Sequence, residues 1–251
     1  MADLQTAARQ ALACLDLTSL NDGDSAADIE ALCRRAQSPF GTVAAVCVWP
    51  RFVAQARSLL PAGIRVAAVA NFPAGSLDLD RALDDVAAIA QAGADEIDVV
   101  LPYRALMAGQ RSEVAEFLAE VRFASRPLTL KLIIESGELK DAELIRDATR
   151  MGLVAGADFI KTSTGKTPVS ATLDAARLML HEIQASGLAN AGFKASGGIR
   201  SVTDATAYLA LAQQALGTVS PQRMRFGASG LLNDIEAVLG GSATAAEHSS
   251  Y

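Results

Sequence analysis

Two segments of the sequence begin with the same four residues and then place opposite charges at the same offset. Ala92–Asp95 leads to Asp98, and Ala155–Asp158 leads to Lys161, so each charge lies three residues after the repeated Asp. In both segments the Gly follows a helical pattern and precedes an apolar run, which predicts a helix end and then a buried parallel strand. A charge inside such a strand is costly unless it is paired or used chemically. We therefore expect the chemistry at these two side chains.

Lys161 is the strongest candidate for a nucleophile. Burial in an apolar strand, together with the like charges of Lys194 and Lys166, should favour the neutral amine, and a neutral amine can attack a carbonyl carbon. Asp98 could move protons as a general acid or base, and Lys194 could keep Lys161 neutral while exchanging protons itself. The alternative is a structural network of ion pairs among these side chains, which the sequence alone leaves open.

Further polar residues come near the carboxyl ends of other predicted strands. Four of them could line the same cavity and hold substrate hydroxyl groups: Asp16, Thr18, Cys47 and Lys131. Cys47 stands between Val46 and Val48, where cysteine is more often a small core residue, so we give it little catalytic weight.

Three loops carry a second signal, which suits a phosphate group. They are Ser163–Lys166, Gly197–Arg200 and Gly227–Gly230. Glycines let backbone N–H groups approach an anion, a following helix N-terminus adds its positive dipole end, and Lys166 and Arg200 supply charge. For any single loop the glycines could instead serve only tight turns between strand and helix. Three such loops together favour the phosphate site.

The elements that would position these residues alternate along the chain. Eight apolar runs, each followed by a segment of helical period, predict a single-domain (β/α)₈ barrel of the α/β class. The expected strands are 12–17, 42–48, 64–70, 94–100, 128–135, 157–162, 192–195 and 224–228, and the expected helices are 26–37, 50–60, 78–92, 111–124, 138–155, 170–187, 201–216 and 230–239. The segment after the first strand has no dinucleotide-binding fingerprint, which speaks against a doubly wound sheet. The barrel domain is expected over 1–239, and 240–251 is expected to be a flexible tail.

Composition narrows the class of protein. The chain has 251 residues, of which 51% are hydrophobic, and a net charge of −6, so a large core is expected and general nucleic-acid binding is not. Three cysteines without Cys-x-x-Cys spacing and only two histidines suggest neither a disulfide framework nor a zinc site or a histidine-rich metal site. Without a basic segment leading into an apolar core at the start, and without a long uncharged apolar stretch, we expect a cytosolic protein that does not bind membranes.

Several segments together resemble the deoxyribose-phosphate aldolases. They are Leu15–Thr18, Glu96–Arg104, Ile134–Leu139, Phe159–Gly165, Lys194–Arg200 and Arg225–Ser229. The resemblance covers nearly the whole chain, and its most specific segment is the one around Lys161. It departs from the family pattern at Ala195-Ser196 and at Gly230, where a second Ser is common, so one phosphate contact is expected to be weaker.

The resemblance implies a cofactor-independent and metal-independent class I aldolase. It would reversibly join acetaldehyde to D-glyceraldehyde 3-phosphate, giving 2-deoxy-D-ribose 5-phosphate. Lys161 would form the Schiff base, Lys194 would perturb the pKa of Lys161, and Asp98 would move protons. The implied substrate-binding residues are Asp16, Thr18, Cys47, Lys131, Thr162, Gly165, Lys166, Gly197, Gly198, Arg200, Gly227 and Ser229. Tyr251 would enter the barrel mouth and exchange protons at the enamine carbon, unless the tail has no role.

Two other functions remain open from the residues alone. A sugar-phosphate epimerase or isomerase would use Asp98 as a base and Lys161 as an electrostatic clamp, and it would give no borohydride-trapped adduct. A phosphosugar-binding module would be protected against heat by its ligand but would show no aldol cleavage. Phosphate binding alone, however, needs no lysine inside the barrel. A small phosphosugar and aldehydes are the expected partners, and apolar residues on the helices are compatible with a homodimer.

Overall fold

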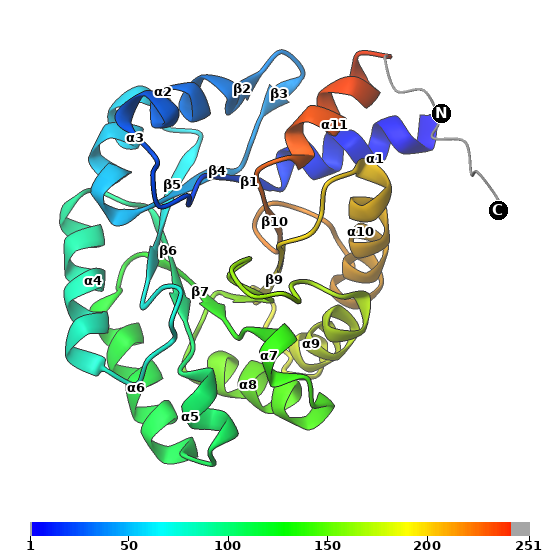
Figure 1. Cartoon of the computed structure of the whole chain (residues 1–251). Coiled ribbons are helices and arrows are strands. Elements are labelled where there is room, and N and C mark those ends of the chain that lie inside the picture. Colours follow the sequence, from blue (N-terminus) through cyan, green and yellow to red (C-terminus); the bar gives the residue numbers. More distant parts are fainter. Residues whose placement is uncertain (1, 242–251) are drawn as a thin grey trace.

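Eight parallel strands close into a barrel with helices around it (Figure 1). The computed structural model describes residues 2–241. Hydrogen bonds join the barrel strands in the order β1, β10, β9, β8, β7, β6, β5, β4 and back to β1. Their bounds are β1 Leu15–Thr18, β4 Ala45–Val48, β5 Arg65–Ala70, β6 Glu96–Val100, β7 Thr129–Ile133, β8 Phe159–Lys161, β9 Gly192–Ser196 and β10 Met224–Ala228. The predicted (β/α)₈ barrel is confirmed.

Helices follow the strands and cover the outside of the barrel (Figure 1). The main ones are α2 Ala26–Arg35, α3 Val53–Leu59, α4 Leu79–Gln91, α6 Arg111–Ala124, α8 Ala142–Val154, α9 Leu173–Ala185, α10 Val202–Leu216 and α11 Leu231–Leu239. Several begin at side chains that accept a hydrogen bond from the first turn, such as Ser25, Asp141, Thr172 and Ser201. These N-caps satisfy backbone donors that would otherwise lack a partner.

The repeated Ala-Gly-Ala-Asp segments have the same structure at both places. Gly93 and Gly156 each follow a helix and have a φ of +86°, a conformation that glycine adopts without strain. The Asp that lies two residues after each of them accepts a hydrogen bond from the second residue of the preceding strand, Asp95 from Val66 N at 2.9 Å and Asp158 from Leu130 N at 2.8 Å. The repeat therefore sets the register in which β6 and β8 enter the barrel.

Several elements differ from the sequence-based expectation. Residues Ala2–Ala13 form helix α1, which packs on α10 and α11, so the first strand begins at Leu15 and not at residue 12. The last turn of α1 includes the beginning of the apolar run 12–17, which predicts the first strand. Short elements were also unexpected: the hairpin of β2 (Gln37–Ser38) and β3 (Gly41–Thr42), the 3₁₀ helix η1 (Pro50–Phe52), and the helices α5 (Tyr103–Met107) and α7 (Ser136–Leu139).

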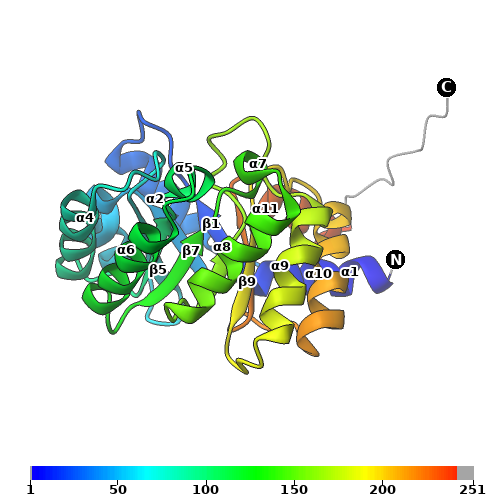
Figure 2. The same cartoon turned by 90° about the horizontal axis from the view of Figure 1, so that it is seen from below.

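The apolar core lies mainly between the strands and the surrounding helices. A second, smaller cluster of Leu20, Cys47, Ala67 and Val69 lies apart from it, with Trp49 and Phe72 packed against it. Along each strand, the side chains that alternate with those of the large core point into the barrel. Asp98 and Lys131 are among them and are fully buried. Figure 2 shows the barrel turned by 90°, with α5 and α7 at one end of it. Among residues 2–241, no helix has the length and apolarity needed to span a bilayer.

Candidate active site

Seven charged side chains meet inside the barrel and are joined by ion pairs. We call them the interior cluster: Asp16, Glu96, Asp98, Lys131, Lys161, Lys194 and Arg225. They come from six strands and are at most 6% exposed. Asp98 contacts both Lys161 and Lys194, as the sequence predicts. Four bases face three carboxylates. Since charge imbalance is unfavourable in a buried site, one titratable base is expected to be neutral.

Lys161 is the base least supported by carboxylates. Its Nζ contacts one oxygen, Asp98 Oδ2, at 2.8 Å, and that same oxygen accepts a second bond from Lys194 Nζ at 2.7 Å. Burial and the nearby charge of Lys194 lower the pKa of Lys161, and they outweigh the opposing effect of Asp98. Lys161 is therefore the amine most easily present in the neutral, nucleophilic form.

Lys194 has the opposite tendency although it is equally buried. Burial disfavours its charge, but the carboxylates of Asp16, whose Oδ2 lies 2.5 Å from Nζ, and of Asp98 raise its pKa. Burial would also raise the pKa of Asp98, yet Lys131, Lys161 and Lys194 together hold that pKa well below its usual range. Asp98 is thus a carboxylate that joins a neutral amine to a charged one. This arrangement can pass protons between them.

Lys131 and Asp16 are engaged entirely by other members of the interior cluster. Lys131 Nζ lies 2.6 Å from Glu96, 2.8 Å from Asp98 and 3.6 Å from Asp16, and these carboxylates raise its pKa against the effect of burial. The two oxygens of Asp16 are bonded to Lys194 and Arg225. Both residues therefore help to orient the cluster, and their role in holding sugar hydroxyls stays a prediction.

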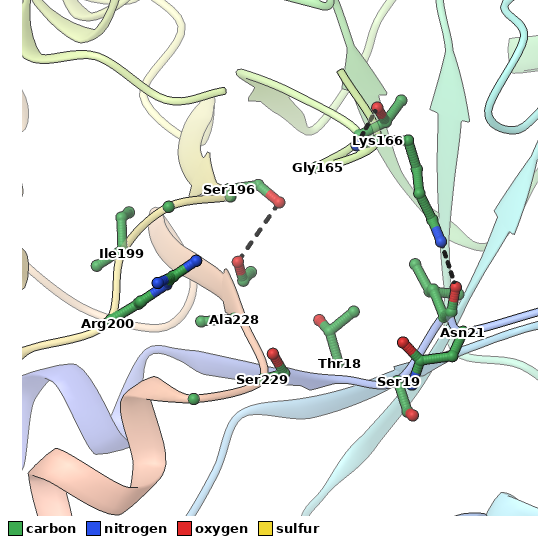
Figure 3. A pocket seen from close by; sticks show the side chains of 16 residues that line it. Thr18, Ser19, Asn21, Gly165, Lys166, Ser196, Ile199, Arg200, Ala228 and Ser229 are labelled. Carbon is green, nitrogen blue, oxygen red and sulfur yellow. Dashed lines mark hydrogen bonds between the residues drawn. The ribbon is translucent and has the colours of Figure 1, made fainter. Parts of the chain in front are cut away.

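A cavity of about 480 Å³ opens at the carboxyl ends of the strands (Figure 3). We call it the mouth cavity. It is lined by Thr18–Asn21, Thr164–Lys166, Ser196–Arg200 and Gly227–Gly230, so the three predicted glycine-rich loops do lie together. A Cβ built on Gly227 would lie 3.1 Å from Lys194 Cε, which places one wall of the mouth cavity directly against the interior cluster.

Two basic side chains enter the mouth cavity from different loops. Lys166 Nζ donates to the carbonyl of Leu20 at 2.7 Å, and Arg200 comes from the loop that follows β9 (Figure 3). Buried Glu135 holds the loop that carries Lys166, since its carboxylate accepts a hydrogen bond from the hydroxyl of Thr164 at 2.5 Å. The cavity therefore combines fixed positive charge with backbone N–H groups, which suits an anionic group of phosphate size.

Two other predicted residues, Thr162 and Cys47, do not line the mouth cavity. The hydroxyl of Thr162 is used between β8 and β9, where it donates to the Ser196 carbonyl and accepts from Ser196 N. Cys47 is fully buried in the small apolar cluster, and burial raises the pKa of its thiol. Gly230, where the sequence departs from the expected pattern, does line the cavity. Tyr251 lies outside the described residues.

Sequence reasoning gave no role to several residues at the site. Glu96 and Arg225 belong to the interior cluster, and Ser19, Leu20 and Asn21 line the mouth cavity. Arg225 carried the same signal as the lysines, a charge between apolar neighbours in a predicted strand. Within residues 2–241, no group of three or more His, Cys, Asp or Glu side chains is arranged to hold a metal ion.

Comparison with known proteins agrees with this geometry. The sequence model of the DeoC/LacD aldolases matches residues 10–236. The chain belongs to the DeoC/LacD aldolase family. A curated deoxyribose-phosphate aldolase from Agrobacterium fabrum is 49% identical over 250 residues, which is 98% of this chain and 96% of that protein.

Solved structures of similar chains have the same fold. A chain from Toxoplasma gondii ME49 superposes with a TM-score of 0.86 at 25% identity, over 97% of this chain and all of that one. A deoxyribose phosphate aldolase from Aeropyrum pernix, described as tetrameric, gives a TM-score of 0.74 at 22% identity, over 94% of this chain and 97% of that one. The second likeness shows the barrel alone.

Proposed function

We propose that this member of the DeoC/LacD family is a class I deoxyribose-phosphate aldolase. It cleaves 2-deoxy-D-ribose 5-phosphate reversibly into D-glyceraldehyde 3-phosphate and acetaldehyde. The observation that carries the proposal is a buried lysine of lowered pKa beside a charged Lys–Asp pair, next to a cavity suited to phosphate. The name of the Agrobacterium fabrum relative supports the substrate.

In this proposal Lys161 is the nucleophile. Its neutral Nζ attacks the aldehyde carbon of the open-chain sugar, and loss of water leaves an iminium ion. The iminium accepts the electron pair released when the bond between carbons 2 and 3 breaks. Removal of the proton from the 3-hydroxyl frees glyceraldehyde 3-phosphate, protonation of the enamine restores the iminium, and water then releases acetaldehyde and Lys161.

Asp98 and Lys194 move the protons that these steps require. Lys194 is charged and shares Asp98 Oδ2 with Lys161, so it can supply a proton to the departing hydroxyl of the carbinolamine and recover it later. The positive charge of Lys194 also keeps Lys161 neutral between turnovers. No residue described here other than Lys161 combines a lowered amine pKa with this position.

The phosphate would bind in the mouth cavity. Its ligands would be Lys166, Arg200 and the backbone of the three glycine-rich loops, through Gly165, Gly197, Gly198, Gly227 and Ser229. Thr18 and Cys47 would contact the sugar or aldehyde portion. Tyr251 stays a proposed proton donor at the enamine carbon, and deleting it should slow exchange of acetaldehyde methyl protons without preventing imine formation.

Borohydride trapping tests the proposed function directly. Reduction in the presence of acetaldehyde should add a two-carbon unit to Lys161, located by mass spectrometry of peptides, and Lys161→Met should abolish it. Absence of an adduct from wild-type protein would favour proton abstraction by Asp98, as in an isomerase.

We also propose a cytosolic homodimer, and light scattering of the purified full chain tests the dimer.

A further inference from the structure

Arg225 is buried inside the barrel and takes part in no step of the proposed reaction. Its register partner on β9 is Lys194, and its guanidinium lies between Asp16 and Glu96. Nη1 donates to Asp16 Oδ1 at 2.6 Å and Nη2 to Glu96 Oε1 at 2.8 Å, while Nε donates to the carbonyl of Pro221. All three of its guanidinium nitrogens donate to protein oxygens, only 6% of its surface is exposed, and Arg225 does not line the mouth cavity.

The surroundings of Arg225 also separate it from the mouth cavity. Arg225 and Glu96 line a second cavity, of about 580 Å³, together with residues that begin β7 and β8. This cavity therefore lies at the amino-terminal end of the barrel, opposite the mouth cavity. The Arg225 guanidinium also lies 5.4 Å from the centre of the Phe159 ring. Any effect of Arg225 on catalysis must pass through its neighbours.

The interior cluster holds more bases than carboxylates. The interior cluster contains Arg225 and three lysines against Asp16, Glu96 and Asp98. Arginine does not lose its proton in proteins, so the missing proton must come from a lysine. Lys131 contacts three carboxylates and Lys194 contacts two, whereas Lys161 contacts only one oxygen that it shares with Lys194.

We propose that Arg225 is a positioning residue whose permanent charge gives the interior cluster one base more than it has carboxylates, so that Lys161 is the amine left neutral. The proposal rests on the proposed function of Lys161 and adds the origin of its reactivity. Groups facing Lys161 are Asp98, Lys194 and the Cys47 thiol, and those facing Arg225 are Asp16, Glu96, Lys131 and the Cys14 thiol. Both thiols are buried, and burial is the largest effect on each of them and raises its pKa.

The test is the pH dependence of imine formation with acetaldehyde, measured as the initial rate of cyanoborohydride trapping on Lys161. Arg225→Met leaves three bases and three carboxylates, so the apparent pKa of Lys161 should rise by at least about one unit. At a pH below that apparent pKa, the initial rate of trapping should therefore fall about tenfold. Arg225→Lys keeps the charge and should keep the wild-type profile.

A double variant separates charge from structural damage. Arg225→Met combined with Glu96→Gln removes the whole ion pair but restores the surplus of one base, so its apparent pKa should return towards the wild-type value. Loss of packing would move the double variant further from wild type than the single one. If Arg225→Met does not fold, Glu96→Gln alone increases the surplus and should shift the profile to lower pH.

Two results would overturn the inference. An unchanged trapping profile in Arg225→Met shows that the surplus charge does not set the state of Lys161, and so does a double variant that fails to revert. Both results leave the proposed function intact provided that wild-type protein forms the adduct on Lys161. Absence of that adduct in wild-type protein is instead a failure of the proposed function itself.

Discussion

Replacing Asp98 by Asn should separate imine formation from proton transfer. The carboxylate of Asp98 accepts bonds from Lys131 at 2.8 Å, Lys161 at 2.8 Å and Lys194 at 2.7 Å, all inside the barrel. The amide is nearly isosteric but carries no charge. Removing one partner of a buried ion pair is strongly destabilising, so the free energy of unfolding should fall by about 3–5 kcal/mol.

The chemical effects of Asp98→Asn should differ between two steps. Without the carboxylate, which favours the charged amine, the pKa of Lys161 should fall further, so borohydride trapping with acetaldehyde should persist at neutral pH. Turnover should fall by about 10²–10⁴-fold, because a positioned acid or base is lost. Trapping and release of acetaldehyde from 2-deoxy-D-ribose 5-phosphate are measured on the same preparation.

The repeat supplies a matched control for Asp98→Asn. Asp95 lies three residues earlier and is bonded to Arg57 and to the backbone of Val66 outside the interior cluster. Asp95→Asn should lower the free energy of unfolding by about 1–3 kcal/mol without changing trapping per folded molecule. Loss of trapping in folded Asp98→Asn, or a fall in turnover of less than about tenfold, would refute the proposed role of Asp98.

The effect of Asp98 on stability should also depend on pH. Its pKa is lower in the folded protein than the usual value of 3.8, so its stabilising contribution is complete above that value and is lost as the pH falls towards the folded pKa. The difference in unfolding free energy between wild type and Asp98→Asn should therefore be largest near pH 7 and shrink below about pH 4. Urea unfolding at both pH values measures it.

Three further predictions follow from other parts of the structure. Lys166→Ala should raise the KM for the phosphorylated sugar about tenfold or more while acetaldehyde trapping persists, because Lys166 lies in the mouth cavity. Gly152→Ala should lower the free energy of unfolding by about 1–3 kcal/mol, since its Cβ would lie 2.6 Å from Leu132 and 2.7 Å from Ile160, as urea unfolding would show. Lys161→Met should abolish turnover yet raise that free energy by about 0.5–2 kcal/mol, because an amine whose charge is disfavoured by burial is removed; a less stable variant would contradict this.

The sequence predicted those parts of the site that depend on local pattern. A charge inside an apolar strand is visible without a structure, and the parity of strands then brings Asp98, Lys161 and Lys194 to one interior. The glycine-rich loops were predictable for the same reason, because each follows its own strand. The first strand was placed three residues too early, since the last turn of α1 is as apolar as the strand that follows it.

Contacts between distant segments could not be predicted in this way. Lys166 meets the carbonyl of Leu20 across 146 residues, and Arg225 meets Asp16 across 209. Both contacts depend on the closure of the barrel, which brings β1 beside β10. The motif around Lys161 predicts that Thr162 binds substrate, but it gives no sign that the Thr162 hydroxyl bonds the backbone of Ser196 on the neighbouring strand.

Barrel closure also explains how one uncompensated base can persist inside the protein. The large apolar core lies mainly between strands and helices, outside the ring of strands, so most of the apolar stabilisation of the barrel comes from side chains that are not part of the interior cluster. A carboxylate facing Lys161 alone would stabilise the folded state and hold the amine protonated. Instead Asp98 is shared among three lysines, and the imbalance is maintained by a fold whose stability comes from elsewhere. In the proposed mechanism, the reactivity of Lys161 is thus a consequence of which carboxylates the other bases have already engaged.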